Sequence, residues 1–218
     1  MSLQSVRARI AAAAERAGRS RDSVRLVVVS KGQTPTAIRN LYDQGQRDFG
    51  ENRAQELAVK VDQLPPDIVW HFVGPLQTNK VRIVRPAVAL LHSLDREDLI
   101  PPWVKGSGAP PPALIQVRIG GEAQKHGVNP EDALELCERA SAAGIEVAGL
   151  MTIPPLVVGA EEARPFFDEL VAVSHEVQQQ LPTAREISMG MTDDFEVAVE
   201  AGATIVRIGR AIFAEMPN

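Results

Sequence analysis

The sequence is short of several residue types, and each shortage excludes a class of protein. Cys137 is the single cysteine among 218 residues, which excludes an intramolecular disulfide and a multi-cysteine metal site. No segment approaches the roughly 18 consecutive apolar residues that a membrane-spanning helix needs. The first residues also lack the apolar core and the cleavage pattern of a secretory signal. We therefore expect a cytoplasmic protein in a reducing compartment, without a membrane partner.

Positive charge is also scarce. The chain has 23 Lys and Arg against 28 Asp and Glu, for a formal net charge of -5. Nucleic-acid binding depends on clustered Lys and Arg, so we expect no nucleic acid as a partner.

The four histidines show no spacing such as H-E-x-x-H, so no metal site is expected. His71 and His92 fall within predicted strands, where we interpret them as hydrogen-bonded residues of the core or of a binding site. His126 and His175 are interpreted as surface residues.

What the sequence does contain is a regular alternation of apolar runs and helical spacing. A helix is predicted over 3–17, and the continuous run Leu26–Val29 follows it. Such β-branched runs suit strands that are buried on both faces, as in parallel sheets. Further strands are predicted at 48–50, 68–73, 88–92, 114–117, 145–150, 186–189 and 203–208, and a helical pattern follows each of them.

Eight strand–helix units predict an α/β fold, a single (β/α)8 TIM barrel over residues 1–218 with an extra N-terminal helix. A doubly wound open sheet is the alternative, but no G-x-G-x-x-G follows the first strand. The Pro/Gly-rich stretch 101–112 would be a linker in a two-domain protein, yet the same alternation of strands and helices continues after it.

Asp193 and Glu196 have the spacing of a capping box, which predicts a helix from 193 to 201.

Chemistry in such a barrel is expected where strands end. Lys31 directly follows the first strand, so its stem should lie in the barrel mouth. A desolvated lysine can act as a Schiff-base nucleophile, whereas a surface lysine or a strand-end salt bridge is the alternative. Arg207 lies within the last strand, where a charge is costly unless it is paired. It therefore indicates a ligand or an internal carboxylate.

Two glycine-containing turns indicate an anion site. The segments Ser188–Met191 and Arg207–Gly209 each lead into a predicted helix, whose first N–H groups and positive dipole end favour an anion. The loops after strands 7 and 8 form the usual phosphate site of barrels. Two plain strand–helix turns are the alternative reading.

Several motifs stand together in the order of a known family, the pyridoxal phosphate homeostasis proteins, which this chain resembles over nearly its whole length. The motifs are Val28-Val-Ser-Lys31, Asp48-Phe-Gly-Glu-Asn52, Trp70-His-Phe-Val-Gly74, Leu76-Gln-Thr-Asn-Lys80, Lys125-His-Gly127, Gly149-Leu-Met-Thr-Ile153, Ser188-Met-Gly-Met-Thr-Asp-Asp-Phe195 and Val206-Arg-Ile-Gly209.

The resemblance implies a barrel like the N-terminal domain of alanine racemase that holds pyridoxal 5'-phosphate. Lys31 matches the Schiff-base lysine, Arg207 matches the arginine that faces the pyridine nitrogen, and Asn52 matches a residue that lines the ring pocket. The phosphate cradle of the family is matched by Ser188, Met189, Gly190 and Gly209.

The chain departs from the family pattern at the cradle. Arg210 stands where the family commonly has a threonine beside the phosphate. Its backbone N–H remains, while its guanidinium either binds the phosphate or points outward.

The resemblance also bears on catalysis. An arginine at the ring nitrogen should leave that nitrogen unprotonated and the ring a weak electron sink. Racemisation needs a second acid/base, but Tyr42 is the single tyrosine and the chain ends with the barrel. We therefore expect a monomeric carrier or regulator in vitamin B6 homeostasis, with no catalytic residue and with pyridoxal-phosphate-dependent apoenzymes as partners. The alternatives are an active pyridoxal-phosphate-dependent amino-acid racemase and a Schiff-base aldolase.

Overall fold

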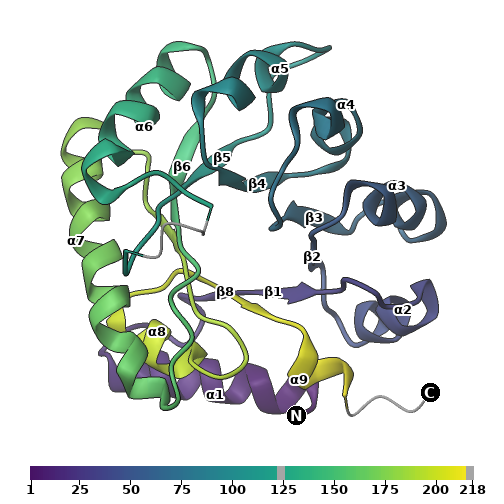
Figure 1. Cartoon of the computed structure of the whole chain (residues 1–218). Coiled ribbons are helices and arrows are strands. Elements are labelled where there is room, and N and C mark those ends of the chain that lie inside the picture. The colour runs from purple at the N-terminus through teal and green to yellow at the C-terminus, as the bar shows by residue number, and fades with distance from the viewer. Residues whose placement is uncertain (122–125, 215–218) are drawn as a thin grey trace.

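The chain folds into a closed barrel of parallel strands (Figure 1). The computed structural model describes residues 1–121 and 126–214. The strands are β1 (Arg25–Val29), β2 (Asp48–Glu51), β3 (Val69–Phe72), β4 (Leu90–Leu94), β5 (Ala113–Gln116), β6 (Val147–Met151), β7 (Glu186–Ser188) and β8 (Ile205–Ile208). Each strand pairs with the next, and β8 pairs with β1. The predicted (β/α)8 barrel is confirmed.

Helices surround the barrel, and one of them precedes the first strand. They are α1 (Leu3–Arg16), α2 (Pro35–Asp43), α3 (Ala54–Gln63), α4 (Val81–Val84), α5 (Ile100–Val104), α6 (Ala133–Ala142), α7 (Arg164–Gln180), α8 (Phe195–Ala201) and α9 (Arg210–Phe213). Short 3-10 turns lie before α4, α5, α6 and α7, and another follows α4. No helix within the described ranges has both the length and the apolar character needed to cross a bilayer.

Buried apolar side chains form two layers. The inner cluster fills the barrel and takes one residue from each of five strands: Val27, Leu90, Leu114, Met151 and Ile205. The larger cluster lies between the strands and the helices, which is why the predicted strands are apolar on both faces. Cys137 is buried in α6, and burial raises the pKa of its thiol to about 12.

The extra helix α1 packs along α8 on the outside of the barrel. Its buried face includes Leu3, Val6 and Ile10, and the Ser2 hydroxyl caps its first turn by accepting from the Ser5 N–H. Figure 1 shows α1 beside α8, and Arg9 forms an ion pair between the two helices with a glutamate of α8.

The Pro/Gly-rich stretch 101–112 is part of the barrel rather than a linker. The Arg85 guanidinium donates to the carbonyls of Trp103 (2.6 Å), Ser107 (3.0 Å) and Gly108 (2.9 Å). The Trp103 indole is fully buried and donates to the Pro111 carbonyl at 2.9 Å. One buried arginine therefore holds the whole stretch against the outer core.

The predicted capping box at α8 is wrong. The N-cap residue is Asp194, and its Oδ1 accepts from the Met191 N–H at 2.6 Å, in the turn before the helix. Asp193 and Glu196 pair instead with arginines of other segments, Arg210 and Arg9. Both side chains therefore form long-range ion pairs instead of the local capping hydrogen bonds.

Candidate functional site

The strand-end residues singled out in the sequence lie at one end of the barrel. Lys31 follows β1 and Asn52 follows β2, while Ser188 ends β7 and Gly209 follows β8. These four strands are consecutive neighbours around the barrel, so the residues share one sector of its mouth.

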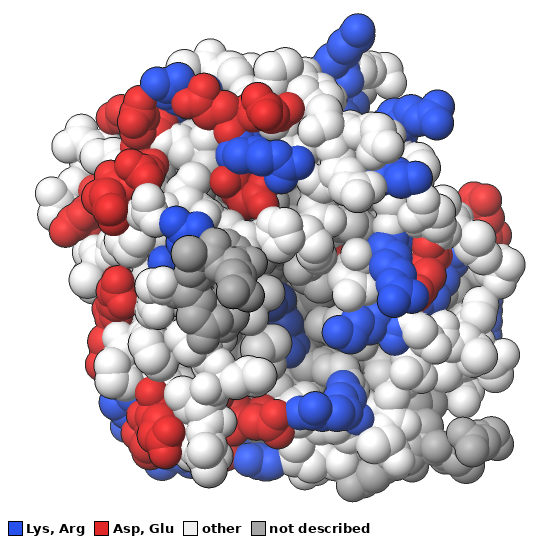
Figure 2. Space-filling view, in the orientation of Figure 1, with Lys and Arg blue, Asp and Glu red and all other residues white. Residues whose placement is uncertain are grey.

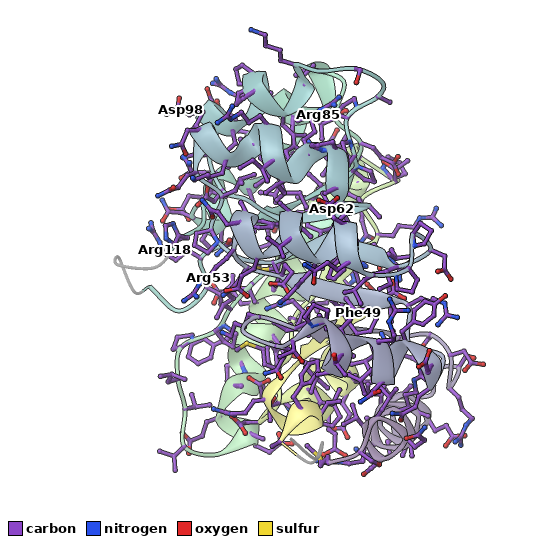
Figure 3. The ribbon with its side chains drawn as sticks, turned by 90° about the vertical axis from the view of Figure 1, so that its right-hand side faces the viewer. Phe49, Arg53, Asp62, Arg85, Asp98 and Arg118 are labelled. Carbon is purple, nitrogen blue, oxygen red and sulfur yellow. The ribbon has the colours of Figure 1, made fainter. Side chains whose placement is uncertain are left out.

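Two views show this end of the molecule. In Figure 3, Arg53 after β2 and Arg118 after β5 project at the same end. The face shown in Figure 2 is hollowed near its centre, with Lys and Arg side chains along the rim.

Helix α3 holds the backbone on both sides of Lys31. The Lys60 ammonium donates to the Ser30 carbonyl at 2.8 Å, and the Glu56 carboxylate accepts from the Gly32 N–H at 2.8 Å. The Gly32 bond is the main reason that the pKa of Glu56 lies below its usual value. The Lys31 side chain itself is exposed, so its amine is presented from a fixed backbone rather than desolvated.

The lysine that donates to the Ser30 carbonyl is itself part of a buried ion pair. The Lys60 Nζ lies 2.6 Å from Glu51 Oε1, and the exposed fractions of the two side chains are 6% and 0%. The Ser30 hydroxyl donates to the same Glu51 oxygen at 2.6 Å. Burial raises the pKa of Glu51, against the opposing effects of Lys60 and Ser30. A buried pair of this kind tolerates the loss of neither partner.

The two glycines of the predicted cradle are required by close packing. Gly190 has φ of 89°, and a Cβ there would lie 2.5 Å from the Ala198 Cβ. A Cβ at Gly209 would lie 2.4 Å from the Val29 carbonyl oxygen in β1. These glycines therefore bring the β7 turn onto α8 and the β8 turn onto β1, beside Lys31. Met189, which precedes Gly190 in the predicted cradle, is fully buried.

Replacing Gly190 by alanine is expected to lower the free energy of unfolding by about 2–5 kcal/mol. Left-handed backbone costs a non-glycine residue about 1–2 kcal/mol, and overpacking adds about 1–3 kcal/mol. Gly144 is the matched control, because it has φ of 92° but no atom within 4 Å of a Cβ. Gly144→Ala should therefore show the backbone strain alone. Urea unfolding of both variants measures the difference, and equal losses would contradict the packing argument.

Arg207 is buried inside the barrel, and its partners are uncharged. It donates to the Ser188 hydroxyl at 2.7 Å and to the Thr152 carbonyl at 2.8 Å. Burial lowers the pKa of Arg207 to about 10, against the attraction of Asp194, so it remains a cation at neutral pH. Of the two expected partners, a ligand or an internal carboxylate, the carboxylate is not among these hydrogen-bond partners. Only two of the five guanidinium N–H groups have acceptors within the described ranges.

Asn52 carries an unsatisfied oxygen. Its Oδ1 is buried, and no donor reaches it within residues 1–121 and 126–214. Gly74 makes room for this residue, since a Cβ there would lie 2.5 Å from the Asn52 Cβ. Asn52 also lines a cavity of about 780 Å³ between the loops after β2, β3 and β4, together with Lys80 and Arg96. A buried acceptor without a partner is costly, so it fits a donor brought by a ligand.

The Arg210 side chain is exposed and paired with an aspartate of the turn between β7 and α8. Its guanidinium forms an ion pair with Asp193, and both side chains are at least three-quarters exposed. Lys125, of the Lys125-His-Gly127 motif, lies outside the described residues.

Sequence reasoning placed His71 and His92 in the core or the site, and the structure confirms that both are buried and hydrogen-bonded. His126 and His175 are exposed, as predicted. Lys60 and Glu51 were missed. Their signal was a lysine within the apolar face of a helix, four residues after Glu56, but nothing local identifies its partner.

Known proteins resemble this chain over nearly its whole length. The family described as "Alanine racemase, N-terminal domain" matches residues 1–217. A pyridoxal phosphate homeostasis protein of Aquifex aeolicus is 44% identical to this chain over 219 residues, which cover 98% of this chain and 96% of the relative.

Solved structures agree in fold over the same length. An unknown protein from Bifidobacterium adolescentis has a TM-score of 0.90 at 34% identity, and the match covers 96% of this chain and 92% of that protein. PipY of Synechococcus elongatus, solved with pyridoxal phosphate bound, has a TM-score of 0.79 at 35% identity, with 94% and 99% covered. The chain therefore belongs to the alanine racemase N-terminal domain family and, within it, to the pyridoxal phosphate homeostasis proteins.

Proposed function

We propose that residues 1–218 act as one unit that binds pyridoxal 5'-phosphate through Lys31 and serves in its homeostasis as a carrier or regulator. One observation supports this proposal best. An exposed lysine, whose flanking backbone is hydrogen-bonded to α3, follows a strand that lies next to the strand of a buried arginine. In β8, Arg207 pairs in register with Val27 of β1, four residues before Lys31. The PipY structure with pyridoxal phosphate bound supports the same ligand class for this fold.

The residues present fit this cofactor. Bound pyridoxal phosphate supplies an aldehyde that condenses with a lysine amine, a phosphate dianion and a pyridine nitrogen. Lys31 would provide the amine, and Arg207 has free N–H groups and the positive charge to face the ring nitrogen. The unsatisfied Asn52 oxygen would accept a hydrogen bond at the ring. Backbone N–H groups of the turns at Gly190 and Gly209 would hold the phosphate.

Arg207 also decides what the site can do. Pyridoxal enzymes that stabilise carbanions commonly place a carboxylate at the ring nitrogen, which keeps it protonated. A cation in that position disfavours protonation, so the site suits holding the cofactor better than demanding carbanion chemistry. Within the described residues no group of three or more His, Cys, Asp or Glu side chains could hold a metal ion.

The test of the proposed function uses the wild-type chain. Purified protein is expected to take up pyridoxal phosphate in a 1:1 complex, and borohydride is expected to fix the adduct on the peptide that contains Lys31. Absorption spectra and mass spectrometry provide the two readouts. A protein that shows no adduct would overturn the proposal. Sustained turnover of amino acids by the loaded protein would indicate an enzyme, and trapping of a substrate without any cofactor would indicate an aldolase.

The proposal includes a recipient and a compartment. We propose that the chain acts as a monomer and that pyridoxal-phosphate-dependent apoenzymes receive the cofactor. The buried, single Cys137 fits a reducing compartment, and we propose the cytoplasm. Analytical ultracentrifugation measures the first point. Activation of an apoenzyme across a dialysis membrane, compared with activation in one chamber, measures whether the transfer needs contact.

A further inference from the structure

An unbroken line of polar side chains crosses the inside of the barrel. Asp48 Oδ1 lies 3.1 Å from His71 Nε2, and His71 Nδ1 lies 2.9 Å from His92 Nε2. His92 Nδ1 lies 2.9 Å from the Ser188 Oγ, which accepts from Arg207 at 2.7 Å. Four strands besides that of Arg207 contribute one residue each, so the line connects the arginine of the site to β2.

A line of polar side chains is unusual inside a (β/α)8 barrel. The inside of such a barrel is normally filled by branched apolar residues, as it is here around Val27 and Leu114. His71, His92 and Ser188 are fully buried, so each polar atom needs a partner, and each has one. The far end is different, because Asp48 begins β2 and lines a cavity of about 580 Å³ that also includes Arg25 and Arg47. The line therefore runs from that cavity to the site.

The hydrogen bonds can be assigned a single direction. An ionised carboxylate only accepts, so Asp48 requires the proton of His71 on Nε2. With a neutral His71 ring, Nδ1 then accepts from His92 Nε2–H, and His92 Nδ1 accepts from the Ser188 hydroxyl. The Ser188 oxygen accepts from Arg207, which can only donate. Burial, followed by the nearby His71 and Arg207, holds the pKa of His92 well below its usual value, which agrees with a neutral ring.

We propose that Asp48, His71 and His92 are positioning residues that orient the Ser188 hydroxyl and, through it, the Arg207 guanidinium in the ligand site. This inference rests on the proposed function for its ligand, but not for its geometry. It also changes the expected role of Ser188. The hydroxyl proton is donated to His92 and an oxygen lone pair accepts from Arg207, so the side chain serves the ring-nitrogen partner rather than the phosphate.

The first test needs neither a variant nor a ligand. Long-range proton–nitrogen correlation spectra of the 15N-histidine-labelled free protein distinguish the two neutral tautomers from the cation. Both His71 and His92 are expected as neutral Nε2–H tautomers at neutral pH. An Nδ1–H tautomer or a cation at either ring would overturn the assigned direction.

The far end of the line is tested in the same spectra. Asp48→Asn replaces an acceptor-only group by an amide that can also donate, so a fraction of the Nδ1–H form should appear at both rings, as expected when a carboxylate no longer selects the tautomer. Asp22→Asn is the control, because Asp22 lines the same cavity but is exposed and outside the line. Unchanged tautomers in Asp48→Asn would remove Asp48 from the proposal.

The near end is tested by a matched pair of variants at His92. The amide of asparagine lies two bonds beyond Cβ, like Nδ1, whereas that of glutamine lies three bonds beyond, like Nε2. His92→Asn therefore keeps an acceptor for Ser188, and His92→Gln keeps only the contact with His71. Pyridoxal phosphate should bind about tenfold more weakly to His92→Gln, the effect of one hydrogen bond near a charged group, with a shifted absorption maximum. His92→Asn should stay within about twofold of wild type.

The outcomes separate this proposal from the proposed function. Equal effects of the two His92 variants on affinity and absorption, or no effect of either, would overturn the positioning role. Thermal unfolding of both free variants shows whether a loss of affinity reflects misfolding. If wild-type protein binds no pyridoxal phosphate, the proposed function fails. The tautomers of the free protein would still show whether the hydrogen bonds from Asp48 to Ser188 have the assigned direction.

Discussion

Lys31→Ala is expected to abolish the covalent capture of pyridoxal phosphate. The aldehyde needs an amine, and among the described residues Lys31 is the one lysine within two positions of the end of a barrel strand. That strand, β1, pairs with β8, which contains Arg207. The reduced adduct should disappear from the mass spectrum and the cofactor–lysine absorption band should be lost. The free protein should unfold at about the wild-type temperature, because the exposed Lys31 side chain supports no packing.

Two variants complete the Lys31 experiment. Lys31→Arg keeps the positive charge but offers no condensing amine, so it should bind the cofactor reversibly and leave no adduct after borohydride. Lys105→Ala removes an exposed lysine after α5 and should capture the cofactor like the wild type. An adduct of unchanged yield in Lys31→Ala would contradict the assignment of this lysine.

Lys60→Met is expected to cause a large loss of stability. The substitution keeps the length of the side chain but leaves the Glu51 carboxylate buried without a cation. Breaking a buried ion pair in this way costs about 3–5 kcal/mol, which lowers the unfolding temperature of a chain of this size by roughly 10 °C. Covalent capture at Lys31 should also slow, because the Ser30 carbonyl loses its donor.

A second substitution identifies the cause of that loss. Glu51→Gln in the Lys60→Met background removes the uncompensated charge and keeps an oxygen for the Ser30 hydroxyl, so part of the stability should return. Lys105→Met is the surface control and should change the free energy of unfolding by less than about 0.5 kcal/mol. A double variant no more stable than Lys60→Met would contradict the buried-charge explanation.

The pH dependence of Lys60→Met has a definite sign. Burial raises the folded-state pKa of Glu51 above its unfolded value, and the loss of Lys60 should raise it further. The folded state therefore prefers the protonated carboxyl, so its stability is favoured below the unfolded pKa and is lost as the pH rises through the folded pKa. The gap between Lys60→Met and wild type should narrow as the pH falls, and a gap that widens would contradict this reasoning.

The fold was largely predictable because its signals are local. The run Leu26–Val29 needs only its own composition to indicate a strand buried on both faces. The prediction failed where distant charges competed, as at Asp193, which pairs with Arg210 instead of capping α8. It was incomplete at Arg207, where a ligand or an internal carboxylate was expected and the partners within the protein are a hydroxyl and a carbonyl.

The sequence by itself determined the barrel, the lysine after its first strand, the two glycine turns and the membership in a family. Each of these depends on composition, periodicity or the order of motifs along the chain. Only the tertiary structure decided which polar residues meet. His92 and Ser188 are 96 residues apart in sequence, and Lys60 and Ser30 are 30 residues apart. Barrel closure and strand register bring such residues together, and no local pattern encodes a contact between residues that the chain holds so far apart.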